Sequence, residues 1–378
     1  MNKNLIKKII LIAPLSMLMS ASYAEEFKRF SVSAGWLHIM PQGSANPFNI
    51  STVILNGSQH KVGGITPKSF IDSVDLKKAD AMAAEFESSK LSQLNTLLIN
   101  RNDDGKTIAE ASELIDKNGR LIPEATGIVS LNGLENWTQT GTGLEAEKAD
   151  TIGLMMSYYL SDQVSLQFIG GIPPKVEIKG KGEIVAPMSG TAALTHERVA
   201  PYVGESVPLK KDIPITNLGN KPTVSRARAW TPAFEVQYQF GKTGVNKFRP
   251  YVGAGVMYAH YNQIKLHHQV RADLVAAGRM IQIIKDGNAG AALDKVNSSG
   301  NPYVKVKAED SIAPIVTLGF TYDLDYSWYA TASVSYVKLN NLVKVDVINA
   351  NDGSRLIRST SRIDVDPILT YVGVGYRF

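Results

Sequence analysis

Histidines are the residues best suited to catalysis or metal binding, and the chain has six of them: His38, His60, His196, His260, His267 and His268. Acid–base or nucleophilic catalysis requires a histidine that converges with partners such as serine and aspartate. The spacing imposes no such convergence, and the adjacent His267 and His268 have no third metal ligand beside them. We therefore expect no catalytic residue, no metal site and no enzymatic activity.

Two segments rich in aspartate and asparagine faintly resemble calcium-binding loops, residues 102–105 (NDDG) and 116–119 (DKNG). A calcium loop of this kind ends in a carboxylate at its twelfth position, which both segments lack. No glycine-rich phosphate loop is placed between a strand and a helix. We expect turns in both segments and no cofactor.

Composition excludes further classes of function. The absence of cysteine rules out a disulfide framework, a cysteine nucleophile and a thiolate metal site. The formal charge of +5 includes Lys3, Lys7 and Lys8, and without them it is about +2. This small charge argues against a nucleic-acid partner.

Residues 1–24 have the pattern of a signal peptide. A basic start is followed by a short apolar run at 9–19 and by small residues before a cleavage point after Ala24. The run is too short for a membrane-spanning helix of about 20 residues. We expect an exported mature chain, residues 25–378.

The last strand shows where the exported chain resides. From residue 368 onward, one face is apolar and aromatic, and the other is small or polar. Such an alternation over about ten residues indicates a strand between two different environments, here lipid and a lumen. The strand ends the chain at Phe378, and only a closed barrel would give it a second partner.

Seven further segments alternate in the same way, so that eight strands are predicted at 29–40, 151–160, 164–173, 230–240, 247–261, 312–322, 328–339 (extending to 347) and 368–378. Short turns separate strands two and three, four and five, and six and seven. Long connections lie at 43–146, 174–225, 262–307 and 348–361, with helical character at 76–99 and 269–284. We predict an all-β fold: an eight-stranded antiparallel transmembrane β-barrel with short periplasmic turns and long, partly helical extracellular loops, located in the bacterial outer membrane.

Strand parity also predicts the contents of the lumen. Near the periplasmic end, inward positions form a polar plug: Arg29, Ser31, Ser165, Gln167, Glu235, Gln237, Arg249, Thr321 and Tyr329. Arginine and glutamate in a dry lumen must pair, because a lone buried charge is very costly. A seal fits this composition better than a path for water or ions.

Toward the extracellular end, the inward positions become apolar: Leu37, Ile39, Ile169, Pro173, Met257, Tyr261, Val337, Leu339 and Leu369. These residues either line a pocket for an apolar ligand or pack against one another. Four prolines, at 173, 232, 314 and 367, cannot donate ladder hydrogen bonds, so each marks a bulge, a strand end or a weakened seam in the wall.

Two segments carry a family resemblance: 247–258 (KFRPYVGAGVMY) and 362–378 (RIDVDPILTYVGVGYRF). They resemble strands five and eight of the OmpW family of outer-membrane proteins, and 151–173 is similar to its second hairpin. The resemblance covers the strands and leaves out most of the long connections. It implies a narrow barrel that passes small hydrophobic compounds sideways into the membrane lipid, and some members are receptors for phage or bacteriocins. In such a barrel, Tyr376 and Phe378 are the expected C-terminal signal for the outer-membrane assembly machinery.

The sequence thus predicts an outer-membrane channel for small hydrophobic molecules. The alternative is a closed structural or receptor barrel whose extracellular loops bind a bacteriocin, a phage or a host ligand. The apolar upper lumen favours the channel, and the length of residues 43–146 favours the receptor.

Overall fold

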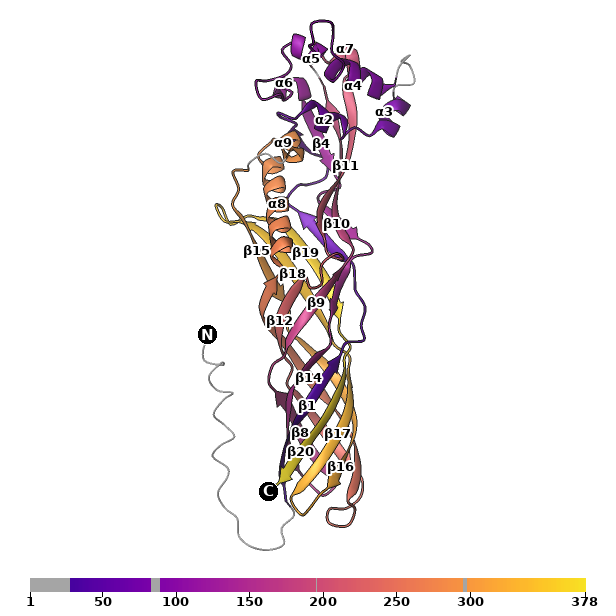
Figure 1. Ribbon diagram of the computed structural model, residues 1–378, viewed down its shortest axis with the longest axis vertical. Helices are drawn as coiled ribbons and strands as arrows, with labels where there is room; N and C mark the ends of the chain where they lie inside the picture. Colours follow the sequence, from indigo (N-terminus) through magenta and orange to yellow (C-terminus); the bar gives the residue numbers. More distant parts are fainter. Residues whose placement is uncertain (1–27, 83–88, 195, 295–297) are drawn as a thin grey trace.

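A computed structural model describes residues 28–82, 89–194, 196–294 and 298–378 of the chain (Figure 1). The predicted signal peptide, residues 1–24, lies outside the described residues. The molecule is elongated, with a barrel at one end, a second β-structure above it, and a cap of short helices and strands at the far end (Figure 1).

Eight antiparallel strands form the barrel: β1 (Phe30–Met40), β7 (Ala149–Tyr159), β8 (Val164–Gly171), β13 (Ala233–Gln239), β14 (Phe248–Leu266), β16 (Ser311–Asp323), β17 (Trp328–Val337) and β20 (Ile368–Arg377). Their order is β13-β8-β7-β1-β20-β17-β16-β14, and pairing of β13 with β14 closes the ring. The first strand therefore pairs with the last, Val32 opposite Tyr376. The prediction of a closed eight-stranded antiparallel barrel is confirmed.

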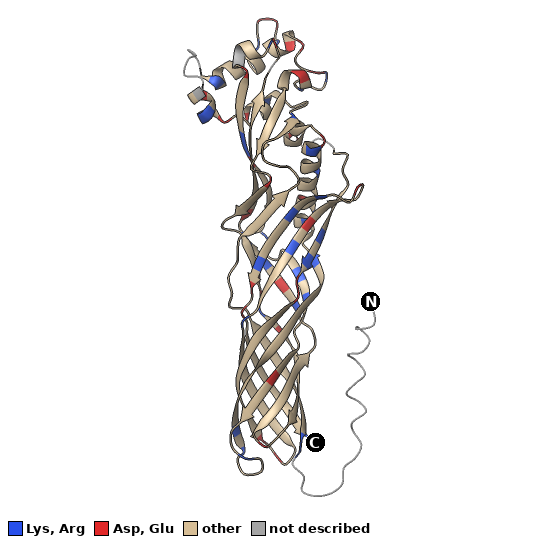
Figure 2. Cartoon of the chain, turned by 180° about the vertical axis from the view of Figure 1, so that it is seen from behind, with Lys and Arg blue, Asp and Glu red and all other residues tan. Residues whose placement is uncertain are grey.

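The outside of the barrel is apolar. Among the described residues, all large hydrophobic side chains that are exposed lie on the barrel strands, their short turns and the C-terminal Phe378, except Val53, Leu55, Ile99, Ile128, Ile172, Trp230 and Tyr303. Charged residues gather at the barrel's turns and above the barrel (Figure 2). This is the surface expected of a barrel in lipid.

Two similar clusters mark the upper edge of the apolar surface. In the first, Trp36 Nε1 and His38 Nδ1 both contact Asp150 Oδ1, at 2.8 and 2.7 Å. In the second, Tyr258 Oη donates to Asp310 Oδ2 at 2.8 Å, and His260 Nδ1 contacts Asp310 Oδ1 at 2.7 Å. Paired aromatic and polar groups of this kind suit a membrane–water boundary. None of the helices in the described part of the chain is long and apolar enough to cross a membrane.

The barrel continues upward into a second β-structure, which we call the extension. One wall prolongs the barrel sheet through the upper part of β14, then β12 (Ser225–Trp230), β9 (Lys175–Lys181) and β6 (Gly143–Ala146). The other wall is a five-stranded sheet in the order β15 (Pro302–Ala308), β18 (Asn340–Asn349), β19 (Arg355–Asp364), β2 (Phe48–Thr52) and β5 (Asn136–Gln139). Helix α8 (His268–Lys285) packs against β15, β18 and β19 and is followed by α9 (Ala289–Leu293).

The cap lies at the end of the extension that is farther from the barrel (Figure 1). Its sheet has the order β11 (Ser206–Asn217), β10 (Glu183–Ala193), β4 (Ile128–Asn132) and β3 (Ser58–Lys61). Its helices are α2 (Pro67–Ile71), α3 (Leu76–Met82), α4 (Lys90–Leu98), α5 (Ile108–Ala111), α6 (Pro123–Thr126) and α7 (Ala200–Val203).

The connections differ from their predicted form in several places. The predicted helix at 269–284 is confirmed as α8, whereas 76–99 contains two helices, α3 and α4, on either side of residues outside the description. Strand seven does not run on to 347, because β17 ends at Val337 and β18 begins at Asn340 in a different sheet. The predicted loop at 348–361 was also wrong: much of it is β19, which pairs with β18 through alternating residues such as Ile357 and Val347.

Candidate functional site: the barrel lumen and the cavity above it

A polar network fills the lumen toward the short turns. Glu235, only 3% exposed, accepts hydrogen bonds from Thr317 Oγ1 at 2.6 Å and from Gln237 Nε2 at 3.2 Å. Gln237 Nε2 also donates to Gln167 Oε1 at 2.7 Å, and Gln167 Nε2 donates to Ser157 Oγ at 3.2 Å. The network thereby links β7, β8, β13 and β16 across the lumen. A connected network of this kind stabilises a closed interior.

The predicted pairing of arginine with glutamate in this plug was wrong. Arg249 instead forms an ion pair with Asp162 in a turn, at 3.3 Å, and donates to the carbonyl oxygens of Asp162 and Phe240. Glu235 stands opposite Gly255, six residues beyond Arg249 on β14. At about 3.4 Å per residue, the backbone positions of Glu235 and Arg249 are roughly 20 Å apart along the strand direction.

Arg29 also departs from its predicted place in the plug. It is exposed and precedes β1, which begins at Phe30. A different arginine is buried at this end: Arg377 donates to Asp323 Oδ1 at 2.7 Å and lies 4.5 Å from the ring centre of Tyr329. The other predicted plug residues are buried: Ser31, Ser165, Gln167, Glu235, Gln237, Arg249, Thr321 and Tyr329.

Apolar side chains fill the lumen toward the extension. They form one cluster that contains or contacts eight of the nine predicted apolar lumen residues, Leu37, Ile39, Ile169, Met257, Tyr261, Val337, Leu339 and Leu369. Pro173 lies outside this cluster, in the wall. The prediction omitted Met155, Ala233, Ala259, Ala313, Ile315 and Tyr371, although strand parity places Ala313 and Ile315 on the inward face of β16.

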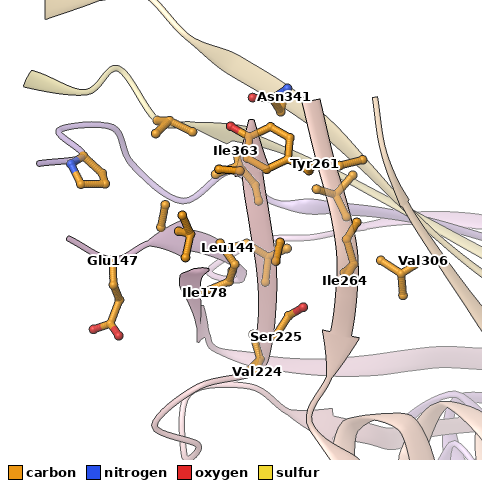
Figure 3. Close-up of a pocket in the computed structure, with 18 of the residues that line it drawn as sticks. Leu144, Glu147, Ile178, Val224, Ser225, Tyr261, Ile264, Val306, Asn341 and Ile363 are labelled. Carbon is orange, nitrogen blue, oxygen red and sulfur yellow. The ribbon is translucent and has the colours of Figure 1, made fainter. Parts of the chain in front are cut away.

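Directly above this cluster lies a cavity of about 140 Å³ (Figure 3). Its floor includes Met257, Leu339 and Leu369 from the apolar cluster. Its walls come from the extension, α8 and the ends of the cap strands β10 and β11, and they are mostly aliphatic: Leu144, Val176, Ile178, Ile184, Leu218, Val224, Ile264, Leu266, Val270, Leu274, Val306, Val343, Val345, Ile363 and Val365. The apolar lumen and the cavity thus form one continuous apolar interior.

The cavity could not be predicted from strand parity in the barrel, because connections distant in sequence build it. Residues near 50 pair with residues near 358 through β2 and β19, and residues near 177 pair with residues near 226 through β9 and β12. One local pattern indicated part of the cavity wall, namely the alternation in β15 (PYVKVKA). Its Val304 and Val306 face inward, while its lysines face outward.

The cavity reaches the wall beside a break in the β-ladder. Below the break, β7 pairs with β8, with Gly153 opposite Gly171, and Ile172 N donates to Ile152 O. Above it, Glu147 N donates to the carbonyl oxygen of residue 177, and β6 pairs with β9 in the same register. Among the described residues, no backbone hydrogen bond joins 148–150 to 173–175. We call these two stretches the unpaired wall segment.

The residues of the unpaired wall segment explain why it has no ladder and place it beside both the cavity and the membrane boundary. Pro173 and Pro174 lack the N–H groups that a ladder would need. Glu147, at the upper edge of the segment, lines the cavity and forms an ion pair with Lys179 at 2.5 Å. The Glu147 carboxylate accepts a hydrogen bond from the Lys179 ammonium group and thereby raises the pKa of Lys179. Asp150, in the segment itself, belongs to the cluster that marks the upper edge of the apolar surface.

The aromatic pair predicted to be the assembly signal lies at the opposite end of the barrel. The rings of Tyr376 and Phe378 meet edge to face at 4.9 Å, and 56% of Phe378 is exposed. Its recognition by the assembly machinery stays a prediction.

A closed eight-stranded barrel with an apolar outside and a filled lumen defines the class of this protein: a β-barrel of the bacterial outer membrane. No family model matches the chain. It is 22% identical over 239 residues to Outer membrane protein W of Vibrio cholerae serotype O1, a match that covers 63% of this chain and 78% of that protein. The chain is thus an OmpW-like eight-stranded outer-membrane barrel.

Two solved structures illustrate the similarity, both with TM-scores below 0.5. The crystal structure of outer membrane protein OprG from Pseudomonas aeruginosa gives a TM-score of 0.46 at 13% identity, covering 93% of this chain and 96% of that chain. The solid-state NMR structure of AlkL in DMPC bilayers gives 0.35 at 12% identity, covering 95% and 97%.

Proposed function

We propose that this protein is an outer-membrane channel for small hydrophobic molecules. A molecule enters the extension from the cell exterior, occupies the apolar cavity, and leaves sideways into the membrane through the unpaired wall segment. The observation that carries the proposal is the continuous apolar interior that reaches from the cavity to the upper lumen.

The size of the cavity supports a small ligand. A cavity of about 150 Å³ lined by aliphatic side chains is large enough to hold benzene, and this one measures about 140 Å³. Burial of apolar ligand surface contributes roughly 25 cal/mol per Å². A cavity of this volume fits a single ring or a short alkyl chain, and it does not fit a bulky lipid.

The polar plug supports a sideways exit. To pass down the lumen, an apolar molecule would have to break the hydrogen bonds that link Glu235, Gln237 and Gln167. Each buried polar group left without a partner costs about 1–3 kcal/mol. No ladder hydrogen bond joins the two stretches of the unpaired wall segment to each other, so a passage between them is the route of lower cost.

A bulky side chain in the cavity tests the proposal. Ala308 lines the cavity, and Ala308→Trp should fill it. Ala332→Trp is the matched control, because Ala332 lies on the outward face of β17 with Val334. A bulky substitution at Gly255 in the barrel would not serve this test, because a Cβ there would lie 1.8 Å from the Phe234 carbonyl oxygen.

The readout is transfer of a small apolar fluorophore into proteoliposomes, with folding checked by heat-modifiable gel mobility. Wild type and Ala332→Trp should accelerate transfer, and folded Ala308→Trp should match empty liposomes. Equal transfer by both variants would exclude the cavity as the route.

One observation favours the receptor as a second candidate. The outward face of the five-stranded sheet carries five basic side chains, Lys305, Lys307, Lys344, Arg358 and Arg362. Figure 2 shows basic residues gathered on the strands above the barrel. Only Lys344 and Arg358 form ion pairs with acids there, Glu309 and Asp346, among the described residues. Such a face suits an acidic surface on a phage, a bacteriocin or a host ligand. Lys305→Glu with Lys307→Glu should abolish such binding and leave transfer unchanged.

A further inference from the structure

We propose that the basic face of the five-stranded sheet, formed by Lys305, Lys307, Lys344, Arg358 and Arg362, binds the headgroup phosphates of lipid in the outer leaflet of the membrane. The face plays no part in the proposed route, so this partner lies beyond the proposed function. Two features of the face carry the assignment: it holds cations without acidic partners, and these cations lie close to the membrane boundary.

Cross-strand pairing brings basic side chains together on this face. Lys307 of β15 stands directly opposite Lys344 of β18. Arg362 of β19 stands opposite Leu342, two residues along β18 from Lys344, and therefore points to the same side of the sheet. Like charges on directly opposed residues destabilise a sheet. An anion bound among the cations would remove this cost.

Two of the five cations already have acidic partners on the same face. Lys344 forms an ion pair with Glu309. Arg358 donates two hydrogen bonds to the Asp346 carboxylate, from Nε at 2.7 Å and from Nη2 at 2.9 Å. This forked contact engages both oxygens of Asp346, and Lys305, which stands opposite Asp346, forms no ion pair with it.

The other three cations, Lys305, Lys307 and Arg362, are exposed and form no ion pair or side-chain hydrogen bond in the part of the chain that the structure describes. Two further acids close to them along the chain have other partners. Asp310 belongs to the second cluster at the edge of the apolar surface, and Asp364 accepts a hydrogen bond from an asparagine amide at 2.9 Å. Three positive charges are thus left for an external anion.

The two lysines of β15 lie just above the membrane boundary. Asp310 marks this boundary, and Lys307 and Lys305 precede it by three and five residues. At about 3.3 Å per residue, their heights above Asp310 cannot exceed roughly 10 and 17 Å. Headgroups occupy roughly 5–8 Å beyond the hydrocarbon core on each side, and lysine side chains extend toward a polar boundary. Lys307 is therefore within reach of lipid phosphates, and Lys305 lies one row above it.

Lipid fits the place of these charges better than an acidic protein does. The basic residues lie on the strands above the barrel (Figure 2), and the cap lies beyond them at the far end of the molecule (Figure 1). A protein that arrives from the exterior meets the cap first, whereas lipid headgroups surround the lower extension at all times. Lysine and arginine bind phosphate oxygens through charge-assisted hydrogen bonds. Each basic residue beside an anionic lipid surface raises affinity about fivefold.

The test compares two forms of lipid A, a phosphorylated glycolipid, in phosphatidylcholine nanodiscs that hold the protein. One form carries its phosphates and the other is dephosphorylated, so the acyl chains are identical. Native mass spectrometry counts the lipid A that stays bound when the protein is released from the discs. With three unpaired cations, wild type should retain the phosphorylated form about a hundredfold more strongly, and about 0.5 M salt should weaken this preference.

Two double variants locate the preference. Lys305→Gln with Lys307→Gln removes two of the three unpaired charges and should lower the preference about 25-fold. Lys77→Gln with Lys78→Gln is the matched control, because both lysines are exposed on α3 in the cap and the same charge is lost. The control should keep the preference of wild type. Both variants should fold by heat-modifiable mobility and transfer the apolar fluorophore as wild type does.

Equal retention of the two lipid A forms by wild type would overturn the inference. An equal loss of preference in both double variants would also overturn it, because net charge and not the basic face would then attract the lipid. Polyglutamate is the probe for an acidic protein partner. If it binds wild type but not the Lys305→Gln, Lys307→Gln variant, and the two lipid forms are retained equally, the face is a protein-binding site instead. None of these results concerns the apolar cavity, so the proposed function stands or fails separately.

Discussion

Arg249 should hold the turn end of the barrel together, and its replacement offers a quantitative test of that role. Its guanidinium is 1% exposed and donates to the carbonyl oxygens of Asp162, Phe240 and Gly241. It also forms an ion pair with Asp162, whose side chain is 25% exposed. Arg249→Met removes all of these donors at once and fills a similar volume.

The expected loss of stability follows from these partners. Removing one member of a buried ion pair costs about 3–5 kcal/mol. Asp162 keeps contact with water, so we expect the lower end, about 3 kcal/mol. Arg249→Lys keeps the charge but not the forked geometry, and it should lose roughly half as much.

Urea unfolding in lipid vesicles, followed by tryptophan fluorescence and gel mobility, measures this loss. Arg29→Met is the matched control, because Arg29 is an exposed arginine at the same end of the barrel. It should change the free energy of unfolding by less than about 0.5 kcal/mol. Equal effects of Arg249→Met and Arg29→Met would refute the structural role of Arg249 at the turn end of the barrel.

Three further predictions concern the packing and the extension. Gly375→Ala should destabilise the barrel by about 1–3 kcal/mol in the same urea assay, because its Cβ would lie 2.2 Å from the buried Tyr329 ring; an unchanged midpoint would contradict this. Leu339→Ala, at a position 2% exposed, should cost about 2–5 kcal/mol and enlarge the cavity, so a folded variant should transfer larger apolar probes than wild type. Hydrogen bonding to Arg358 holds the pKa of Asp346 below its usual range. The stability that this pair contributes is present above the unfolded-state pKa of Asp346 and is lost as pH falls through its folded-state pKa. Acid unfolding of the extension, followed by Trp137 fluorescence, should therefore lose this component in Asp346→Asn.

The barrel could be predicted from the sequence because strand parity depends on local residue types. The inward Gln167, Glu235 and Gln237 and the outward Phe234 and Val236 follow from alternation alone. The lipid environment makes this alternation especially clear, since one face must be apolar.

The extension could not be predicted in this way, because its pairings join distant connections. The alternation in β15 is as regular as in the barrel, yet nothing local shows that β15 pairs with β18 or that β2 pairs with β19. The inward position of Asn341 is known only once that sheet is known. Arg249 was placed near Glu235 because parity gives the face of a strand but not the height of a residue along the barrel.

The central claim about the route is that apolar molecules leave the cavity through the unpaired wall segment. A disulfide across this segment provides the most direct test. The ladders above and below share one register, and its continuation across the unpaired wall segment would bring position 149 opposite position 175. The chain has no cysteine, and Ala149→Cys with Lys175→Cys introduces a single pair. Met156→Cys with Phe168→Cys is the matched control, because these two residues already pair in the intact ladder between β7 and β8.

The measurement is transfer of a small apolar fluorophore into proteoliposomes under oxidising and reducing conditions. The account predicts that oxidation of the 149/175 pair stops transfer, that a reductant restores it, and that the 156/168 pair transfers normally in both states. Undiminished transfer through the oxidised 149/175 pair would contradict the sideways exit.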